Sequence, residues 1–175
     1  MSSKKSLFPM ILAAMFLALA LILPFLTGQL QAFGKALCPM HIPVLLCGFF
    51  CGPWYGLAVG GIAPLLRFAL FGMPQIMPTG LAMCFELGVY GLASGILYRL
   101  LPKKKTCIYA ALIGAMIAGR LVWGAVMAVL TGIGKAAFGW QAFVSGAVLD
   151  AIPGILIQLV LIPVLVMVLE KRTVR

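Results

Sequence analysis

The chain has 175 residues, of which 64% are hydrophobic and 9% are charged, whereas about a quarter of the residues in a soluble domain are charged. Its mean hydropathy of +1.19 excludes a water-soluble fold. A net charge of +10 would suggest nucleic acid or an anionic surface as the partner of a soluble protein. Here the basic residues flank apolar segments instead, so we expect a lipid bilayer and no nucleic acid as the surroundings of this chain.

The first apolar segment covers residues 7–26 and follows Lys4 and Lys5. A membrane-spanning helix needs about 20 apolar residues to cross a hydrocarbon core of about 30 Å. No A-x-A cleavage site follows the segment, so we interpret it as an uncleaved first span and not as a secretory signal.

The next apolar region, residues 37–71, is too long for one span and barely long enough for two, and it contains Pro43, Pro53 and Pro64. With one crossing, the basic cluster at Lys103–Lys105 would lie on the side opposite to the N-terminal lysines. Two crossings keep the basic clusters on one side, as the positive-inside rule requires. We therefore predict a turn at Pro53–Gly56 between two short spans, residues 38–53 and 56–71.

Three further segments satisfy the length criterion for a span: residues 79–101, 106–130 and 143–169. The sequence thus predicts a single membrane domain over residues 1–175, an all-α bundle of six transmembrane helices in the plasma membrane, with the N-terminus and the C-terminus in the cytoplasm. Residues 27–37, 72–78 and 131–142 then form outer loops, which are candidate lids.

Four ionisable residues fall inside predicted spans: Arg67, Glu86, Arg120 and Asp150. Such residues commonly cost about 2.5–3.5 kcal/mol on insertion scales, so each suggests a function. At a rise of about 1.5 Å per residue, all four fall near one level in the middle to outer half of the membrane. They form either two buried ion pairs that fix helix register or a polar pocket open to the outside, where a ligand replaces part of the pairing.

Polar and aromatic neighbours favour the pocket. Tyr90 lies one turn after Glu86, Trp123 lies nearly one turn after Arg120, and Gln158 lies two turns after Asp150. His41 opens the second span at the outer side and Gln75 lies in the second outer loop, so both would face the mouth of the pocket. The alternatives are a hydrogen-bonded residue at a helix start for His41 and a solvated loop residue for Gln75.

Other sequence features limit the chemistry. Ala14 and Ala18 form a small-residue face on the first span, which serves internal packing or docks another membrane protein. The five cysteines and single histidine provide no zinc ligand set, and the cysteines are interpreted as packing residues. The chain has no P-loop, G-x-S-x-G or H-E-x-x-H motif. We therefore expect no metal, no cofactor and no enzymatic activity, but a protein that binds or moves a small molecule.

Several short elements resemble one known family: Ala14–Ala18, Met40–Phe49, Gly52–Gly56, Gly72–Pro74 and Phe85–Gly91. With the size and six predicted spans, the whole chain resembles an S component of an energy-coupling factor (ECF) vitamin transporter. The resemblance implies a protein that captures a vitamin or related precursor from outside, then associates with a transmembrane T component and two cytoplasmic ATPases and topples to release its cargo. It also implies that Ala14 and Ala18 meet the T component, and that residues 34–41 and 72–78 cover the ligand.

The substrate and two other functions stay open. Two arginines suit a carboxylate such as pantothenate, lipoate or a folate, whereas Glu86 and Asp150 suit a donor-rich heterocycle such as pyridoxine, a thiazole or a queuosine precursor. We favour a small heteroaromatic compound that stacks on Tyr90 and Trp123. The competing functions are a self-sufficient secondary transporter that couples through Glu86 or Asp150, and a membrane scaffold in which the charges only pair. A membrane enzyme is the third alternative, and it is disfavoured because the chain lacks the catalytic motifs named above.

Overall fold

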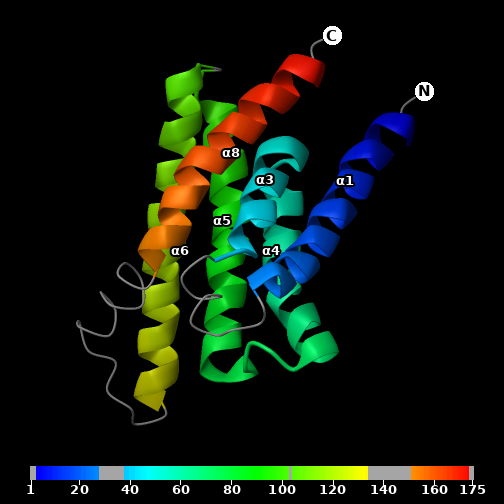
Figure 1. Ribbon diagram of the computed structural model, residues 1–175. Helices are drawn as coiled ribbons and strands as arrows, with labels where there is room; N and C mark the ends of the chain where they lie inside the picture. The colour runs from blue at the N-terminus through cyan, green and yellow to red at the C-terminus, as the bar shows by residue number, and fades with distance from the viewer. Residues whose placement is uncertain (1–2, 28–37, 103, 134–150, 174–175) are drawn as a thin grey trace.

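The computed structural model describes residues 3–27, 38–102, 104–133 and 151–173, and within these ranges it contains helices and no strand (Figure 1). Two short helical turns, η1 (Leu23–Thr27) and η2 (Ile76–Gly80), extend α1 and precede α5. The α-helices are α1 (Ser3–Ile22), α3 (His41–Cys51), α4 (Pro53–Phe71), α5 (Leu81–Leu100), α6 (Lys105–Ile133) and α8 (Ile152–Thr173).

Within the described residues, five helical segments are long and apolar enough to cross a membrane: Leu7–Phe25, Pro53–Phe71, Ile76–Leu100, Lys105–Gly132 and Ile152–Leu169. This confirms the all-α membrane architecture. The remaining helix, α3, has 11 residues and is therefore about 16 Å long, roughly half of the hydrocarbon thickness. The second predicted span, residues 38–53, corresponds to this short helix, and six crossings stay a prediction.

The beginning of α1, the end of α5, the beginning of α6 and the end of α8 all lie at one end of the bundle (Figure 1). Lys104 and Lys105 lie at this end, at the connection between α5 and α6. The arrangement agrees with the expected placement of the basic clusters on one side of the membrane. That this side is the cytoplasm stays a prediction from the positive-inside rule.

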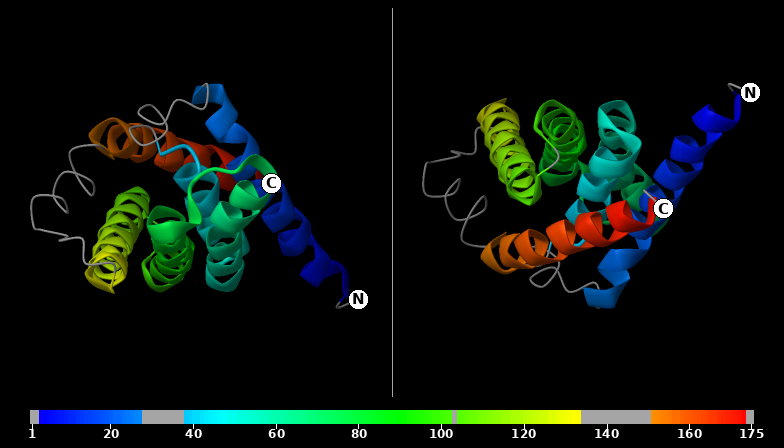
Figure 2. Two further views of the ribbon diagram at one scale, coloured as in Figure 1. Left: turned by 90° about the horizontal axis from the view of Figure 1, so that it is seen from below. Right: turned by 90° about the horizontal axis from the view of Figure 1, so that it is seen from above.

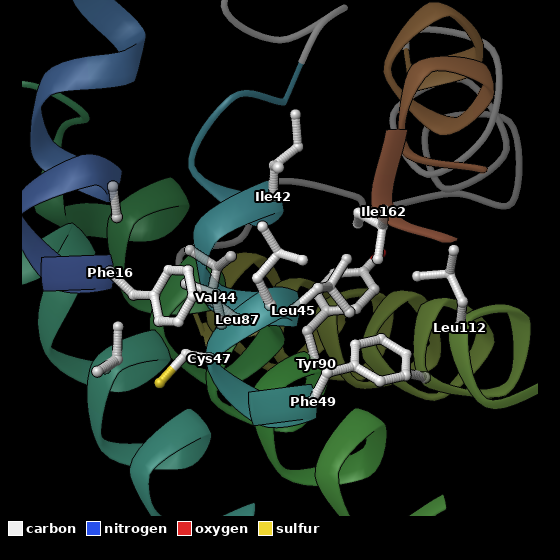
Figure 3. Close-up of a cluster of buried hydrophobic side chains, with 14 of the residues drawn as sticks. Phe16, Ile42, Val44, Leu45, Cys47, Phe49, Leu87, Tyr90, Leu112 and Ile162 are labelled. Atoms are coloured by element: carbon white, nitrogen blue, oxygen red, sulfur yellow. The ribbon is translucent and has the colours of Figure 1, made fainter. Parts of the chain in front are cut away.

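The short helix α3 is the centre of the hydrophobic core, since its residues from His41 to Phe49 are all buried. Figure 3 shows Val44, Leu45 and Phe49 of α3 among side chains from other helices. The surrounding side chains include Phe16 of α1, Leu87 and Tyr90 of α5, Leu112 of α6 and Ile162 of α8. A helix that is apolar and buried all round needs no amphipathic face, because its neighbours cover every side.

Glycines bring α3 and α4 close to α5. A Cβ atom added at Gly91 of α5 would lie 2.7 Å from the Cα of Gly56 in α4, and one added at Gly48 of α3 would overlap the carbonyl of Gly91 and the Ser94 hydroxyl. The Ser94 hydroxyl also lies 3.4 Å from the Leu45 carbonyl of α3, to which it donates. Inside a bilayer the hydrophobic effect does not drive helices together. They associate instead through close backbone approach at small residues.

The turn between α3 and α4 lies at Gly52, earlier than the predicted turn at Pro53–Gly56. Gly52 has a φ of 102°, which favours glycine, and its N–H is within hydrogen-bond distance of the carbonyls of Cys47 and Gly48, at 3.3 and 3.2 Å. Pro53 starts α4, because proline is suited to a first helical position, where an N–H would have no partner. The sequence signal was read as a turn, although Pro53–Gly56 is the first turn of a helix.

Seen along the bundle, α6, α5 and α4 stand next to one another, while α1 leans away and α8 crosses obliquely (Figure 2). The most extensive contacts join α4 to α5 and α5 to α6, and α8 contacts α6 and α3. Helix α5 is thus flanked by α3, α4 and α6, so its side chains can meet residues from several parts of the sequence.

Candidate functional site

Three polar side chains from three helices meet in the interior of the bundle. Arg120 Nη1 of α6 lies 3.0 Å from Glu86 Oε1 of α5, and His41 Nε2 at the start of α3 lies 3.4 Å from the same oxygen. The side chains of His41 and Glu86 are 4% and 2% exposed, and that of Arg120 is 16% exposed. We call these residues the His41–Glu86–Arg120 cluster.

The start of α3 places His41 inside the bundle. The His41 N–H donates to the Cys38 carbonyl at 3.1 Å, which fixes the chain just before the helix. Pro43 lies in the first turn, where the missing N–H removes no helical hydrogen bond. Because α3 is short and buried, its first residue lies among side chains of α5 and α6 instead of at a lipid-exposed helix end.

Gly119 allows α6 to approach α5 closely beside the cluster. A Cβ atom at this position would lie 3.0 Å from two ring carbons of Tyr90 and 3.2 Å from the Glu86 carbonyl oxygen. The next residue in the chain is Arg120, whose guanidinium reaches Glu86 across this narrow contact. Sequence reasoning identified Arg120 as a site residue, and Gly119 continues a four-residue spacing of small residues with Ala111 and Ala115, which is typical of close helix packing.

Tyr90 packs against His41 and is itself 1% exposed. The two rings lie with centroids 5.1 Å apart and an interplanar angle of 73°, an edge-to-face contact. The sequence analysis proposed Tyr90 as a surface on which a ligand stacks. In the structure, the Tyr90 ring is buried in the core and contacts the His41 imidazole.

Cys38 is a further member of the site that the sequence analysis assigned to packing. Arg120 Nη2 donates to Cys38 Sγ at 3.7 Å, while the Cys38 carbonyl accepts the His41 N–H. Cys38 has a φ of 46°, an uncommon conformation for a residue other than glycine, and such strain often occurs at functional sites. Cys38 thus contacts Arg120 through its thiol and His41 through its backbone carbonyl.

Four buried polar atoms of the cluster have no hydrogen-bond partner among the described residues: His41 Nδ1, His41 Nε2, Glu86 Oε1 and Arg120 Nε. The contacts of Glu86 Oε1 with His41 and Arg120 are close enough for ion pairing but lack the alignment of a hydrogen bond. Each unsatisfied buried group costs about 1–3 kcal/mol, and native proteins contain few of them. Their concentration at one place makes the cluster a candidate site for a polar ligand.

Arg67 lies apart from the cluster, although the sequence placed it at the same depth. Its Nη1 donates to the Leu21 carbonyl at 2.9 Å, and its guanidinium lies 5.3 Å and 5.6 Å from the ring centroids of Phe25 and Phe71. Carbonyls in the last turn of a helix have no partner within the helix. Arg67 therefore ties the end of α1 to the end of α4.

The remaining predicted site residues have different surroundings. Gln158 of α8 is 1% exposed, Trp123 of α6 is half-buried, and Gln75 is exposed in the connection between α4 and α5. The backbone carbonyl of Gln75 accepts the Gly80 N–H at 2.8 Å. Asp150 lies outside the described residues.

Ala14 and Ala18 both lie on the exposed side of α1. Ala13, Phe16 and Ala20 form the opposite, buried side of this helix. The predicted partner-binding face is therefore available for a contact with lipid or with another protein. No three His, Cys, Asp or Glu residues in the described parts of the chain come together as metal ligands.

Comparisons with known proteins give one match. The model of a protein family described as the substrate-specific component of the ECF transporter matches residues 9–166, which is most of the chain and includes all members of the cluster. This confirms the resemblance found in the sequence. Searches of curated proteins and of solved structures gave no match.

Proposed function

This chain belongs to the substrate-specific components of ECF transporters, and from that premise we propose that it captures a vitamin or a related micronutrient precursor from outside the cell at the His41–Glu86–Arg120 cluster. Members of this family are substrate-binding transport subunits, not enzymes, and they act with T and ATPase components. Together with its apolar helices, the family makes this chain a multi-pass protein of the plasma membrane. We further propose that ATP hydrolysis by the partner subunits drives uptake.

The observation that supports this binding site is the set of unpaired polar atoms. A salt bridge that only fixes helix register is stabilised when further hydrogen bonds satisfy both partners. In the cluster, both imidazole nitrogens, one carboxylate oxygen and one guanidinium N–H are buried without such bonds. A polar ligand seated between α3, α5 and α6 would satisfy them.

The roles proposed for the residues follow from their positions. His41, Glu86 and Arg120 contact the substrate, and Tyr90 and Cys38 hold them in place. Trp123 lies about one turn further along α6 than Arg120 and borders the site on that side. Gln75, Gln158, Asp150 and Arg67 remain candidate contacts from the sequence, and Arg67 has the weakest case because it joins α1 to α4.

The proposed partner surface is the small-residue face of α1. Ala14 and Ala18 are exposed and lie one turn apart, which leaves a flat strip that a helix of the T component can approach closely. Exposed large side chains such as Ile11 and Met15 flank the strip and suit an apolar partner within the membrane.

A thermal-shift screen of the detergent-purified chain against water-soluble vitamins and their precursors tests the proposal. A ligand at about 100 times its dissociation constant stabilises by about 2.7 kcal/mol. We expect at least one compound to raise the melting temperature of the wild type and of Ser94→Ala, a control that changes a buried polar residue two turns from Glu86. The same compound should fail to stabilise folded Glu86→Gln and Arg120→Gln.

Two results would replace the proposal. Uptake of the identified compound into vesicles that contain this chain alone would establish a secondary transporter. No stabilisation by any compound, with the variants of Glu86 and Arg120 affecting only the melting temperature, would favour a scaffold whose charges are structural.

A further inference from the structure

The unpaired atoms of the His41–Glu86–Arg120 cluster also restrict the chemistry of its ligand. We infer that the part of the substrate that enters the cluster is uncharged and has an amide-type edge, in which an N–H donor lies beside a carbonyl acceptor. This inference rests on the proposed function, since it concerns the ligand of the same site.

Charge balance gives the first argument. Glu86 and Arg120 neutralise each other at 3.0 Å, and the cluster shows no additional unpaired formal charge among its described residues when His41 is neutral. A carboxylate added to the cluster would leave a net negative charge away from water and would lie close to Glu86. An ammonium group would leave a net positive charge away from water and would lie close to Arg120. Buried charges are strongly unfavourable unless they are paired, so an uncharged group fits the cluster best.

Hydrogen-bonding capacity gives the second argument. A neutral imidazole has one donor nitrogen and one acceptor nitrogen, a carboxylate oxygen only accepts, and the guanidinium Nε–H only donates. The unpaired atoms of His41, Glu86 and Arg120 therefore include donors and acceptors in equal number. A carboxylate satisfies only the donors and an ammonium only the acceptors. A carboxamide or a cyclic amide satisfies both kinds with a single planar edge.

The arrangement of the helices agrees with a planar edge. Glu86 Oε1 lies 3.4 Å from His41 Nε2 and 3.0 Å from Arg120 Nη1, so the acceptor oxygen is close to both the imidazole and the guanidinium. Cys38 contacts the guanidinium and Tyr90 contacts the imidazole. Neighbouring donor and acceptor groups that are held in place distinguish ligands mainly by leaving buried groups unpaired when the wrong ligand binds.

The test compares matched probes that differ in charge: nicotinamide with nicotinate, and pantothenol with pantothenate. Binding to the full-length purified chain is measured by calorimetry and by thermal shift at about pH 8, where an ordinary imidazole is neutral. We expect at least one neutral probe to bind at least tenfold more tightly than its carboxylate partner, which corresponds to about 1.4 kcal/mol.

A variant gives an independent readout. Glu86→Gln removes the negative charge and leaves Arg120 without its partner, so the site gains a net positive charge. If the variant is folded, we expect the preference to shift from the neutral probe toward the carboxylate by at least tenfold. A variant that binds more weakly but keeps its preference would speak against the inference.

Equal or tighter binding of both carboxylates by the wild type overturns the inference while leaving the proposed function intact, because a ligand is still captured. Failure of both neutral probes to bind also overturns it. The proposed function fails separately, when no compound of the broader vitamin screen binds. The wild-type comparison does not depend on whether any variant folds.

Discussion

The ion pair between Glu86 and Arg120 makes a quantitative prediction about stability. At 3.0 Å, two unit charges attract by about 5.5 kcal/mol at an effective dielectric constant of about 20. The desolvation of both groups offsets much of this attraction, but removing one partner leaves the other charge buried and uncompensated. We therefore expect Glu86→Gln and Arg120→Gln each to lower the free energy of unfolding by about 3–5 kcal/mol.

The double variant Glu86→Gln/Arg120→Gln leaves no uncompensated charge, and its two amides can bond to each other. It should therefore be less destabilised than the sum of the single variants by roughly 2–3 kcal/mol. Denaturation of the purified chain in detergent, followed by circular dichroism, measures all three variants against Ser94→Ala as a control. Additive single effects, or single variants as stable as the wild type, would refute the reasoning.

Three further predictions concern other parts of the bundle. Gly91→Ala should destabilise by about 3 kcal/mol or more, because its Cβ would overlap the backbone of α4, whereas Gly61→Ala, with nothing within 4 Å of its Cβ, should melt like the wild type. Arg67→Met should lower stability by about 1–3 kcal/mol through the lost bond to α1 and the unpaired carbonyl, yet keep the ligand-induced thermal shift; loss of that shift would place Arg67 in the site. Ala14→Leu and Ala18→Leu should leave the melting temperature of the isolated chain unchanged and reduce its co-purification with the T component, and unchanged co-purification would contradict the proposed partner surface.

The fold was largely predictable because membrane constraints are strict. Apolar length identified the spans of α1, α5, α6 and α8, and the placement of the basic residues on one side separated α4 from the segment before it. The region that includes α3 was harder, since a buried short helix has the same apolar composition as a lipid-facing span. The turn at Gly52 was missed for a local reason: Pro53 starts a helix as readily as it marks a turn.

The site was predictable only in part, because sequence spacing gives the height of a residue along a helix but not the neighbour that it faces. The rise per residue put Arg67, Glu86 and Arg120 near one level. In the structure Arg120 faces Glu86, whereas Arg67 faces the end of α1. The contacts of Cys38 could not be predicted, because they depend on a backbone conformation that the residue type does not indicate.

Close packing and the depth of the site are connected through α3. The glycine contacts with α5 draw this helix into the centre of the bundle, where it is too short to reach both membrane surfaces. Its first residue, His41, therefore lies beside Glu86 within the protein and not at the lipid interface. A longer helix at this position would carry the imidazole past the carboxylate toward the surface. The short length and apolar composition of α3 made it hard to identify as a span. The same two properties explain why a polar cluster lies inside the bundle.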